Sequence, residues 1–416
     1  MNWQRIVSRT ERILSATGPR TNFPDLEKPD ISRLINRIRK ISAKTKHPFL
    51  SVLRTHLRES NLKNQAPYLS FFLAQKSSLD RPLESLMIPL VGKYSFKLFP
   101  QSADHLSLKM NEYRRIGEIC DLINIALSLH RSVVDFPSAQ ETDQHQTVER
   151  ARDMEDGNKL ATLSGDILLA SASLSLAAFQ NPAVVEIMSA AIADAMEADF
   201  SDLMQFMEDG TPLSAPIPGT HGSTDCILTK WLEHIALRHG AMLGTSCEAT
   251  VLLSSPKEQT DVATSVLPNF RRFGLAWASF CRLTDEMAYL KSRLLKNGAK
   301  AATVDTPALP FPCFGFTAYG LFEPMLADAC RLLGGSTQLA PIATLDLYNS
   351  ALEQLRGDLL SALSSLFQLS AQQWQLQQEG KDDEEESILS DSVALLISDA
   401  ASLQAELSTF AAKQPS

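Results

Sequence analysis

Residues 157–172 read GNKLATLSGDILLASA and begin the apolar helix that decides the fold. The apolar pattern continues to Gln180, and the helix is expected to end before Pro182 because proline breaks a helix interior. A second run, 106–135, repeats apolar side chains at helical spacing: Leu106, Met110, Tyr113, Ile116, Ile119, Cys120, Ile123, Leu127, Val133 and Val134. Both patterns predict long helices that bury one face in a common core.

The rest of the chain also favours helices. Glycine occurs 18 times in 416 residues, below its usual share of about 7%. Further helices are predicted over 182–207, 226–254, 258–296, 341–378 and 386–412, with exposed loops over 136–157 and 210–223. The expected fold class is all-α, as one large helical domain.

Composition excludes some functions. A net charge of −9 argues against a broad nucleic-acid surface, which needs basic residues to neutralise phosphates. The apolar stretch 167–185 contains several polar residues and an internal Asn181-Pro182 break, which argues against a transmembrane segment. The six cysteines form no metal-binding or CxxC pattern, so reduced, buried thiols are expected.

The motifs of these two runs resemble the trans-isoprenyl (polyprenyl) diphosphate synthases. The family motif G-N-K-x-A-x-L-x-G-D-x-L-L-A is matched almost letter for letter at 157–170, and its preceding helix resembles EICDLINIALSLHRSVVD at 118–135. Within that family the overall pattern most resembles the second, divergent subunit of decaprenyl diphosphate synthase. The resemblance implies an isoprenoid synthase-type helical bundle.

The resemblance also divides the chain. Residues 1–45 form a helical extension in which arginines give weak organellar targeting character, spoiled by acids such as Glu11 and Asp25. Residues 46–380 form the polyprenyl synthase-like helical domain. Residues 381–416 form an acidic linker and a C-terminal helix.

Departures from the family pattern bear on catalysis. The family holds Mg²⁺ with two D-D-x-x-D motifs, whose first and last carboxylates share a helix face, and the metal neutralises the departing diphosphate. Here the first motif reads RSVVD, with Arg131 four residues before Asp135. This pair is either an ordinary surface ion pair or the remnant of a remodelled site. A cation thereby stands where a metal would bind.

The family's other substrate-binding motifs are altered as well. The second motif keeps Asp285 and Glu286 but ends in tyrosine, with Gly274 retained upstream and Arg282 where the family has Gln. The family's G-G-K-R-x-R-P retains only its lysine, Lys63, and its proline, so the arginines that grip a diphosphate in two places are lost.

The remaining positions carry both a structural and a functional interpretation. The family's Lys-Thr aligns with His239 and Gly240, although His239 is also read as structural or solvent-facing. Asp166 belongs to the retained motif, for which a structural role is favoured. The vestigial substrate-binding candidates are Lys63, Arg131, Asp135, Asp166, His239, Asp285 and Glu286. No catalytic residue and no metal ligand is expected in this chain alone.

The resemblance implies a regulatory, non-catalytic subunit of a heterotetrameric synthase that makes the polyprenyl tail of ubiquinone in mitochondria. A catalytic partner subunit would bind Mg²⁺ and isoprenyl diphosphates. Two alternatives remain open. One is an active prenyltransferase whose metal site uses Asp135, Asp166, Asp285 and Glu286, and the other is a helical isoprenoid-binding protein.

Overall fold

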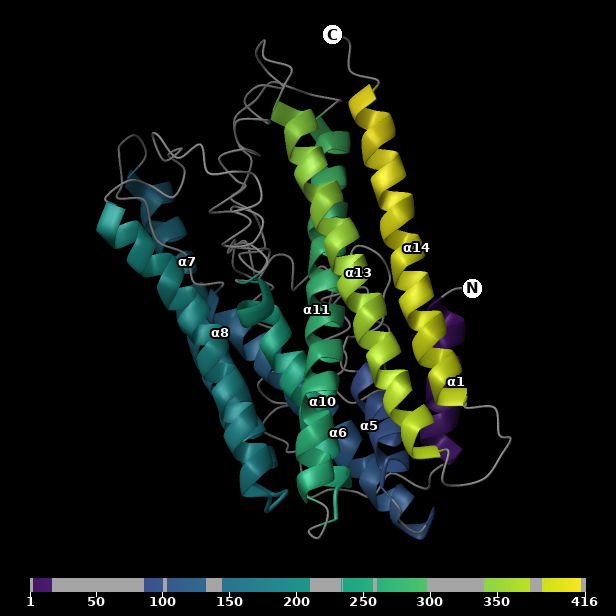
Figure 1. Ribbon diagram of the computed structural model, residues 1–416. Helices are drawn as coiled ribbons and strands as arrows, with labels where there is room; N and C mark the ends of the chain where they lie inside the picture. Colours follow the sequence, from purple (N-terminus) through teal and green to yellow (C-terminus); the bar gives the residue numbers. More distant parts are fainter. Residues whose placement is uncertain are drawn as a thin grey trace.

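The computed structural model describes residues 3–16, 86–99, 103–131, 144–209, 233, 235–256, 260–297, 340–374 and 384–412. Within these ranges every element is a helix and no strand occurs (Figure 1). Buried apolar side chains join into one cluster that extends from Ile6 near the N-terminus to Leu407 near the C-terminus. The prediction of an all-α fold built as one large helical bundle is therefore confirmed.

Helices α10 (Ala241–Ser254) and α11 (Thr260–Asn297) pack together at the centre of the bundle. Their backbones touch at two glycines: a Cβ added to Gly274 would lie 2.8 Å from the Cα of Gly244. Any larger residue would separate the helices, so this close approach requires glycine. Gly274 is the glycine retained from the family's second motif, and the structure gives it a packing role.

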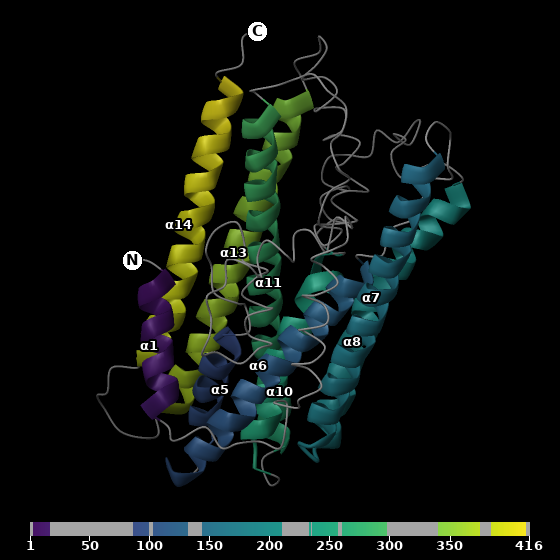
Figure 2. The same ribbon diagram turned by 180° about the vertical axis from the view of Figure 1, so that it is seen from behind.

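The first and last helices pack together on one side of the bundle. Helix α13 (Ala340–Trp374) packs against α11, and α14 (Glu384–Ala412) packs against α13. Helix α1 (Trp3–Ala16) lies beside α14, where Arg9 and Asp391 form an ion pair with Nη1 and Oδ2 2.5 Å apart. Both views place these helices on the side opposite α7 and α8 (Figures 1 and 2).

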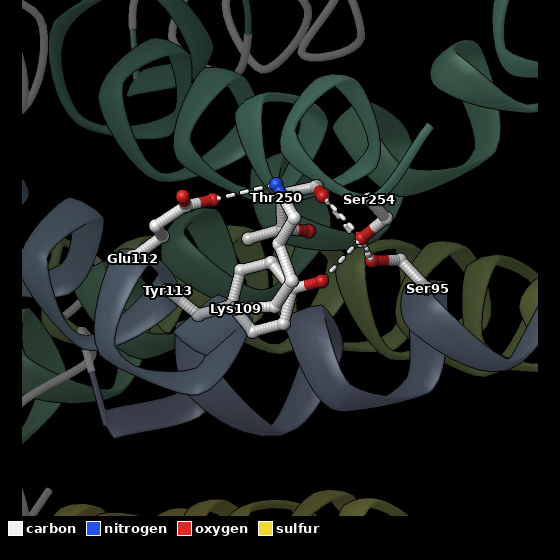
Figure 3. Close-up of polar contacts among 6 residues, drawn as sticks. All are labelled: Ser95, Lys109, Glu112, Tyr113, Thr250 and Ser254. Atoms are coloured by element: carbon white, nitrogen blue, oxygen red, sulfur yellow. Dashed lines mark hydrogen bonds and ion pairs between the residues drawn. The ribbon is translucent and has the colours of Figure 1, made fainter. Parts of the chain in front are cut away.

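Three helices meet in a buried polar network. Helix α5 (Met87–Lys97) contributes Ser95, α6 (Ala103–Arg131) contributes Tyr113, and α10 contributes Ser254. The Ser254 Oγ lies 2.6 Å from the Tyr113 hydroxyl and 2.6 Å from the Ser95 Oγ (Figure 3). All three side chains are fully buried, so each hydroxyl depends on these partners instead of water. The network therefore fixes how α5 and α6 sit on α10.

Helices α7 (Gln144–Ala177) and α8 (Pro182–Asp209) form an outer helical hairpin. The Asn181 Oδ1 accepts a hydrogen bond from the Val184 backbone N–H at 3.4 Å, and Pro182 occupies the first helical position. Asparagine before the first turn and proline inside it are favoured helix-starting residues. Helix α7 packs on α6 and α8 packs on α10, so the hairpin covers the central helices from one side.

The sequence misplaced the beginning of α7. Residues 144–157 were predicted to lie in an exposed loop, but they are helical. The charged segment supports a helix through pairs such as Lys159 with Glu155, whose Nζ and Oε1 lie 2.6 Å apart at i,i+4 spacing. Elsewhere the predictions over 182–207, 258–296 and 386–412 agree with α8, α11 and α14. Predictions before residue 86, apart from the first helix, and over 298–339 lie outside the described residues.

Two described segments, Glu155–Ala177 and Glu386–Thr409, are long and apolar enough to cross a membrane by length and composition. In each, 39% of the most apolar window is buried inside the protein. Core helices of globular proteins pass the same test, so the finding is weak evidence for a span. Among the described cysteines, Cys120, Cys247 and Cys281 are buried thiols, as the sequence predicted.

Candidate functional site

The first candidate site lies at the end of α6, where Arg131 begins the degenerate acidic motif. The preceding residue, His130, faces α7. Its Nε2 lies 3.1 Å from the Asp166 Oδ1 and 3.2 Å from the Thr162 carbonyl oxygen. Both oxygens accept hydrogen bonds, so Nε2 carries a proton and donates to them. Asp166 therefore helps to hold α7 on α6.

Gly165 explains why this contact is so close. A Cβ at this position would lie 2.3 Å from Nε2 and 2.4 Å from Cδ2 of His130. Real side chains do not approach to that distance, so an added Cβ would force the imidazole out of this position. The Gly-Asp pair of the retained motif thus provides a place for the His130 ring and a carboxylate that accepts its hydrogen bond.

The second candidate site lies where α11 passes the π-helical turn η2 (Ala236–Gly240). The Arg282 Nη2 lies 3.3 Å from the His239 Nδ1. A guanidinium only donates, so Nδ1 accepts, and the neutral ring carries its proton on Nε2. The adjacent Arg238 is buried in the same turn. Single π-helical turns are rare in proteins, and those that occur are often found at functional sites. This one brings basic side chains to α11, the helix that carries the second motif.

These residues do not fit a magnesium cluster. Magnesium takes oxygen ligands in near-octahedral geometry, and carboxylates are its usual protein ligands. Arg282 instead places a permanent positive charge one helical turn before Asp285 on α11. In the part of the chain that the structure describes, no three His, Cys, Asp or Glu side chains come together. The acids of the two motifs are outside the described side chains, so the absence of a metal site in this chain stays a prediction.

The structure places the predicted site residues as follows. Asp166 and His239 belong to two different pairs, one between α6 and α7 and the other between η2 and α11. Arg131 ends α6, and Asp285 and Glu286 lie within α11, but their side chains are not described.

Two candidates, Lys63 and Asp135, lie outside the described residues. The sequence did not reveal that His130 contacts Asp166 or that Arg282 contacts His239, because the members of each pair are distant in the chain. The only sequence signal for the first partner was the Gly-Asp pair of the motif at 165–166, since a glycine in a helix interior often marks a close approach.

Comparisons with known proteins agree with the resemblance. The human all trans-polyprenyl-diphosphate synthase PDSS2 is 30% identical over 256 residues, covering 61% of this chain and 56% of that protein. The probable mitochondrial hexaprenyl pyrophosphate synthase of Neurospora crassa is 30% identical over 174 residues, covering 42% and 34%. Decaprenyl-diphosphate synthase subunit 1 of Schizosaccharomyces pombe is 28% identical over 139 residues, covering 33% of each chain. No protein-family model matches the chain.

Among solved structures, a polyprenyl synthase from Caulobacter crescentus CB15 matches with a TM-score of 0.45 and 16% identity, covering 94% of this chain and 98% of that one. In sequence the chain is thus similar to trans-polyprenyl diphosphate synthases. In particular it is similar to the PDSS2 proteins, as the likeness to a second decaprenyl synthase subunit predicted. The alignment spans little more than half of the human protein's length.

Proposed function

We propose that this chain is a non-catalytic subunit of a heteromeric trans-polyprenyl diphosphate synthase. It supplies a helical framework and an interface, whereas a homologous subunit binds Mg²⁺ and forms the carbon–carbon bonds. The matched relatives include a PDSS2 synthase and a protein named as a synthase subunit, which supports a heteromeric arrangement.

One observation carries the proposal: the packing of the family motif is intact while Arg282 brings a positive charge one helical turn before the second acidic motif. His130, Gly165 and Asp166 fit together closely. At the second motif, by contrast, Arg282 contacts His239 one turn before Asp285. A guanidinium repels a divalent cation, so Arg282 disfavours a magnesium–diphosphate complex next to the second motif.

The names of the relatives bear on where the complex acts and what it makes. The Neurospora crassa relative is named as mitochondrial, and the others are named as polyprenyl or decaprenyl synthases. We therefore place the complex in mitochondria, where its product would be the isoprenoid side chain of ubiquinone. The product length would follow from the active site of the catalytic subunit.

The test measures chain elongation. The purified chain, a catalytic homologue from the same source and the two together are incubated with farnesyl diphosphate, labelled isopentenyl diphosphate and Mg²⁺. The proposal expects no elongation by this chain alone and a several-fold stimulation, or a changed product length, when both are present. Robust elongation by this chain alone would instead support an active enzyme that uses Asp285 and Glu286.

A matched pair of variants makes the test specific. Leu163 and Leu174 are exposed on α7, whereas Leu108 and Leu360 are exposed on α6 and α13. Leu163→Asp with Leu174→Asp should abolish the stimulation, and Leu108→Asp with Leu360→Asp should retain it. If no homologue binds the chain and the purified chain nevertheless binds an isoprenoid, the isoprenoid-binding alternative would replace the proposal.

A further inference from the structure

The first helix of the chain is tied to the last one through a single guanidinium. Arg9 on α1 reaches two residues of α14: its Nη1 contacts the Asp391 carboxylate, and its Nη2 lies 3.2 Å from the Ser387 Oγ. A guanidinium only donates, so the serine hydroxyl accepts this hydrogen bond. Ser387 and Asp391 are one helical turn apart, so Arg9 spans one turn of the facing helix.

The Ser387 side chain is exposed although Arg9 contacts it. The next two residues, Ile388 and Leu389, are fully buried in the core. Core packing thus fixes this turn of α14 while the serine hydroxyl stays accessible. A phosphate attached to such a hydroxyl would find a guanidinium already in place beside it.

Helix α1 presents more than one arginine on this side. Arg5, Arg9 and Arg12 follow each other by four and three residues, which places them along one side of the helix. In both views α1 runs down from the N-terminus and α14 runs up to the C-terminus (Figures 1 and 2). The turn of α1 that follows Arg9 and carries Arg12 is therefore directed towards the beginning of α14.

The sequence just before Ser387 is acidic, since residues 382–386 read DDEEE. Charge complementarity selects protein partners, so a serine that follows several acids suits a protein kinase whose substrate-binding groove is basic. Sequence and structure thus agree at this position: the acids favour delivery of a phosphoryl group to Ser387, and the arginines of α1 favour its retention in a defined contact.

From these contacts we propose that Ser387 is a phosphorylation site whose phosphate is bound by Arg9 and Arg12. A protein kinase transfers the γ-phosphoryl group of a nucleoside triphosphate to the Ser387 Oγ. The bond from that phosphorus to the oxygen bridging the β-phosphate breaks, and the Oγ–P bond forms. The hydroxyl proton passes to the kinase, and a nucleoside diphosphate leaves. A neutral hydroxyl is thereby replaced by a group of charge about −2 at pH 7.

The phosphate strengthens the contact between the two helices. Its oxygens accept hydrogen bonds from guanidinium groups, and such charge-assisted bonds are roughly twice as strong as neutral ones. Arg9 donates through Nη2 to the phosphate while Nη1 keeps its contact with Asp391. Arg12 supplies a second positive charge, which offsets the repulsion from Asp391 and from the acids at 382–386. Phosphorylation therefore holds α1 more firmly on α14.

Backbone-amide hydrogen exchange measures how often α1 leaves α14. The full chain is prepared with phosphoserine encoded at position 387 and compared with the unmodified chain. Phosphoserine at 387 should slow exchange over residues 3–16 at least fivefold, and added salt should reduce the effect. Ser402 is exposed on the same helix about four turns further along. Phosphoserine at 402 is the matched control and should leave this exchange unchanged.

Substitution of the two arginines tests whether they bind the phosphate. Arg9→Gln with Arg12→Gln should remove the slowing that phosphoserine at 387 produces. Because this double variant can loosen α1 even without phosphate, each variant is compared with its own unmodified form. Arg9→Lys with Arg12→Lys keeps both charges but loses the planar fork, so it should retain part of the slowing.

The modification itself is measured in a separate reaction. The purified chain is incubated with labelled ATP and a casein kinase, whose substrates are acidic, and the phosphopeptides are identified by mass spectrometry. Label should enter Ser387, disappear in Ser387→Ala and persist in Ser402→Ala. Three results would each overturn the proposal. They are a chain without phosphate at Ser387, exchange over 3–16 that is unchanged or faster with phosphoserine at 387, and a slowing that persists undiminished in Arg9→Gln with Arg12→Gln.

Discussion

The imidazole of His130 and the carboxylate of Asp166 join α6 to α7, with Nε2 and Oδ1 3.1 Å apart. The residue before Asp166 is Gly165, where any side chain would collide with the same ring. A short sequence motif thus encodes a contact between two helices. The packing of the His130 ring against Gly165 and Asp166 accounts for the retention of this motif in the chain.

Gly165→Ala should lower the free energy of unfolding by about 1–3 kcal/mol, the usual cost of overpacking a close contact. The physical reason is the clash with the His130 ring, 2.3 Å from the added Cβ. Urea unfolding followed by circular dichroism measures the change. Combining it with His130→Ala should remove most of the added cost, because the clashing ring is gone.

Gly357→Ala is the matched control. It lies in α13, and a Cβ there would meet nothing within 4 Å. The higher helix propensity of alanine should raise the free energy of unfolding by up to about 1 kcal/mol. If both alanine variants changed stability by the same amount, the close contact at Gly165 would not be real.

Tyr113→Phe should cost about 1–3 kcal/mol of stability because it deletes one hydroxyl from the buried network and leaves the Ser254 Oγ with one partner fewer. The same unfolding experiment measures the change. Ser365→Ala, which removes an exposed hydroxyl bonded to the Ser361 carbonyl, should change stability by less than about 0.5 kcal/mol. A neutral Tyr113→Phe variant would contradict the network.

Alkaline pH should reveal the same tyrosine. Burial raises the pKa of Tyr113 above its ordinary value of about 10. Above pH 10 the unfolded chain releases this proton while the folded chain keeps it, so the free energy of unfolding falls as pH rises. The stability difference between wild type and Tyr113→Phe should therefore be constant from pH 7 to about 9 and shrink above about 10. A difference that grew with pH would show the opposite shift.

Restoring acids to the first motif should not restore catalysis. Arg131→Asp with Ser132→Asp restores two carboxylates. The diphosphate-binding arginines of the family's motif around Lys63 are still absent from the sequence, and Arg282 still precedes Asp285. Incorporation of labelled isopentenyl diphosphate by the purified variant should equal background. Measurable turnover would show that the diphosphate-binding sites are better preserved than the sequence indicates.

The sequence predicted the helical framework because apolar periodicity follows directly from which face each helix buries. It placed α8 and α11 within a few residues, and the motif at 157–170 identified the family relationship. It failed at 144–157, where abundant charged side chains favoured a loop. The structure shows that such residues can lie on a helix and pair along it, as Lys159 does with Glu155.

The candidate site was less predictable. Pattern and alignment selected Asp166, His239 and Arg282 as separate positions, but not the contacts they make, because a contact between residues distant in sequence leaves no periodic trace. The π-helical turn that carries His239 was also invisible, since it inserts a local irregularity into an otherwise helical pattern. These features arise from how α6 meets α7 and how η2 meets α11, which only the assembled bundle reveals.

The most direct test of the central claim is whether this chain alone binds magnesium together with a diphosphate. Calorimetry with a non-hydrolysable farnesyl diphosphate analogue is run on the purified chain with and without Mg²⁺, and a catalytic homologue serves as the positive control. The account predicts that Mg²⁺ leaves the affinity of this chain for the analogue unchanged while it strengthens binding to the homologue. Tight analogue binding by this chain that requires two or more magnesium ions would contradict it.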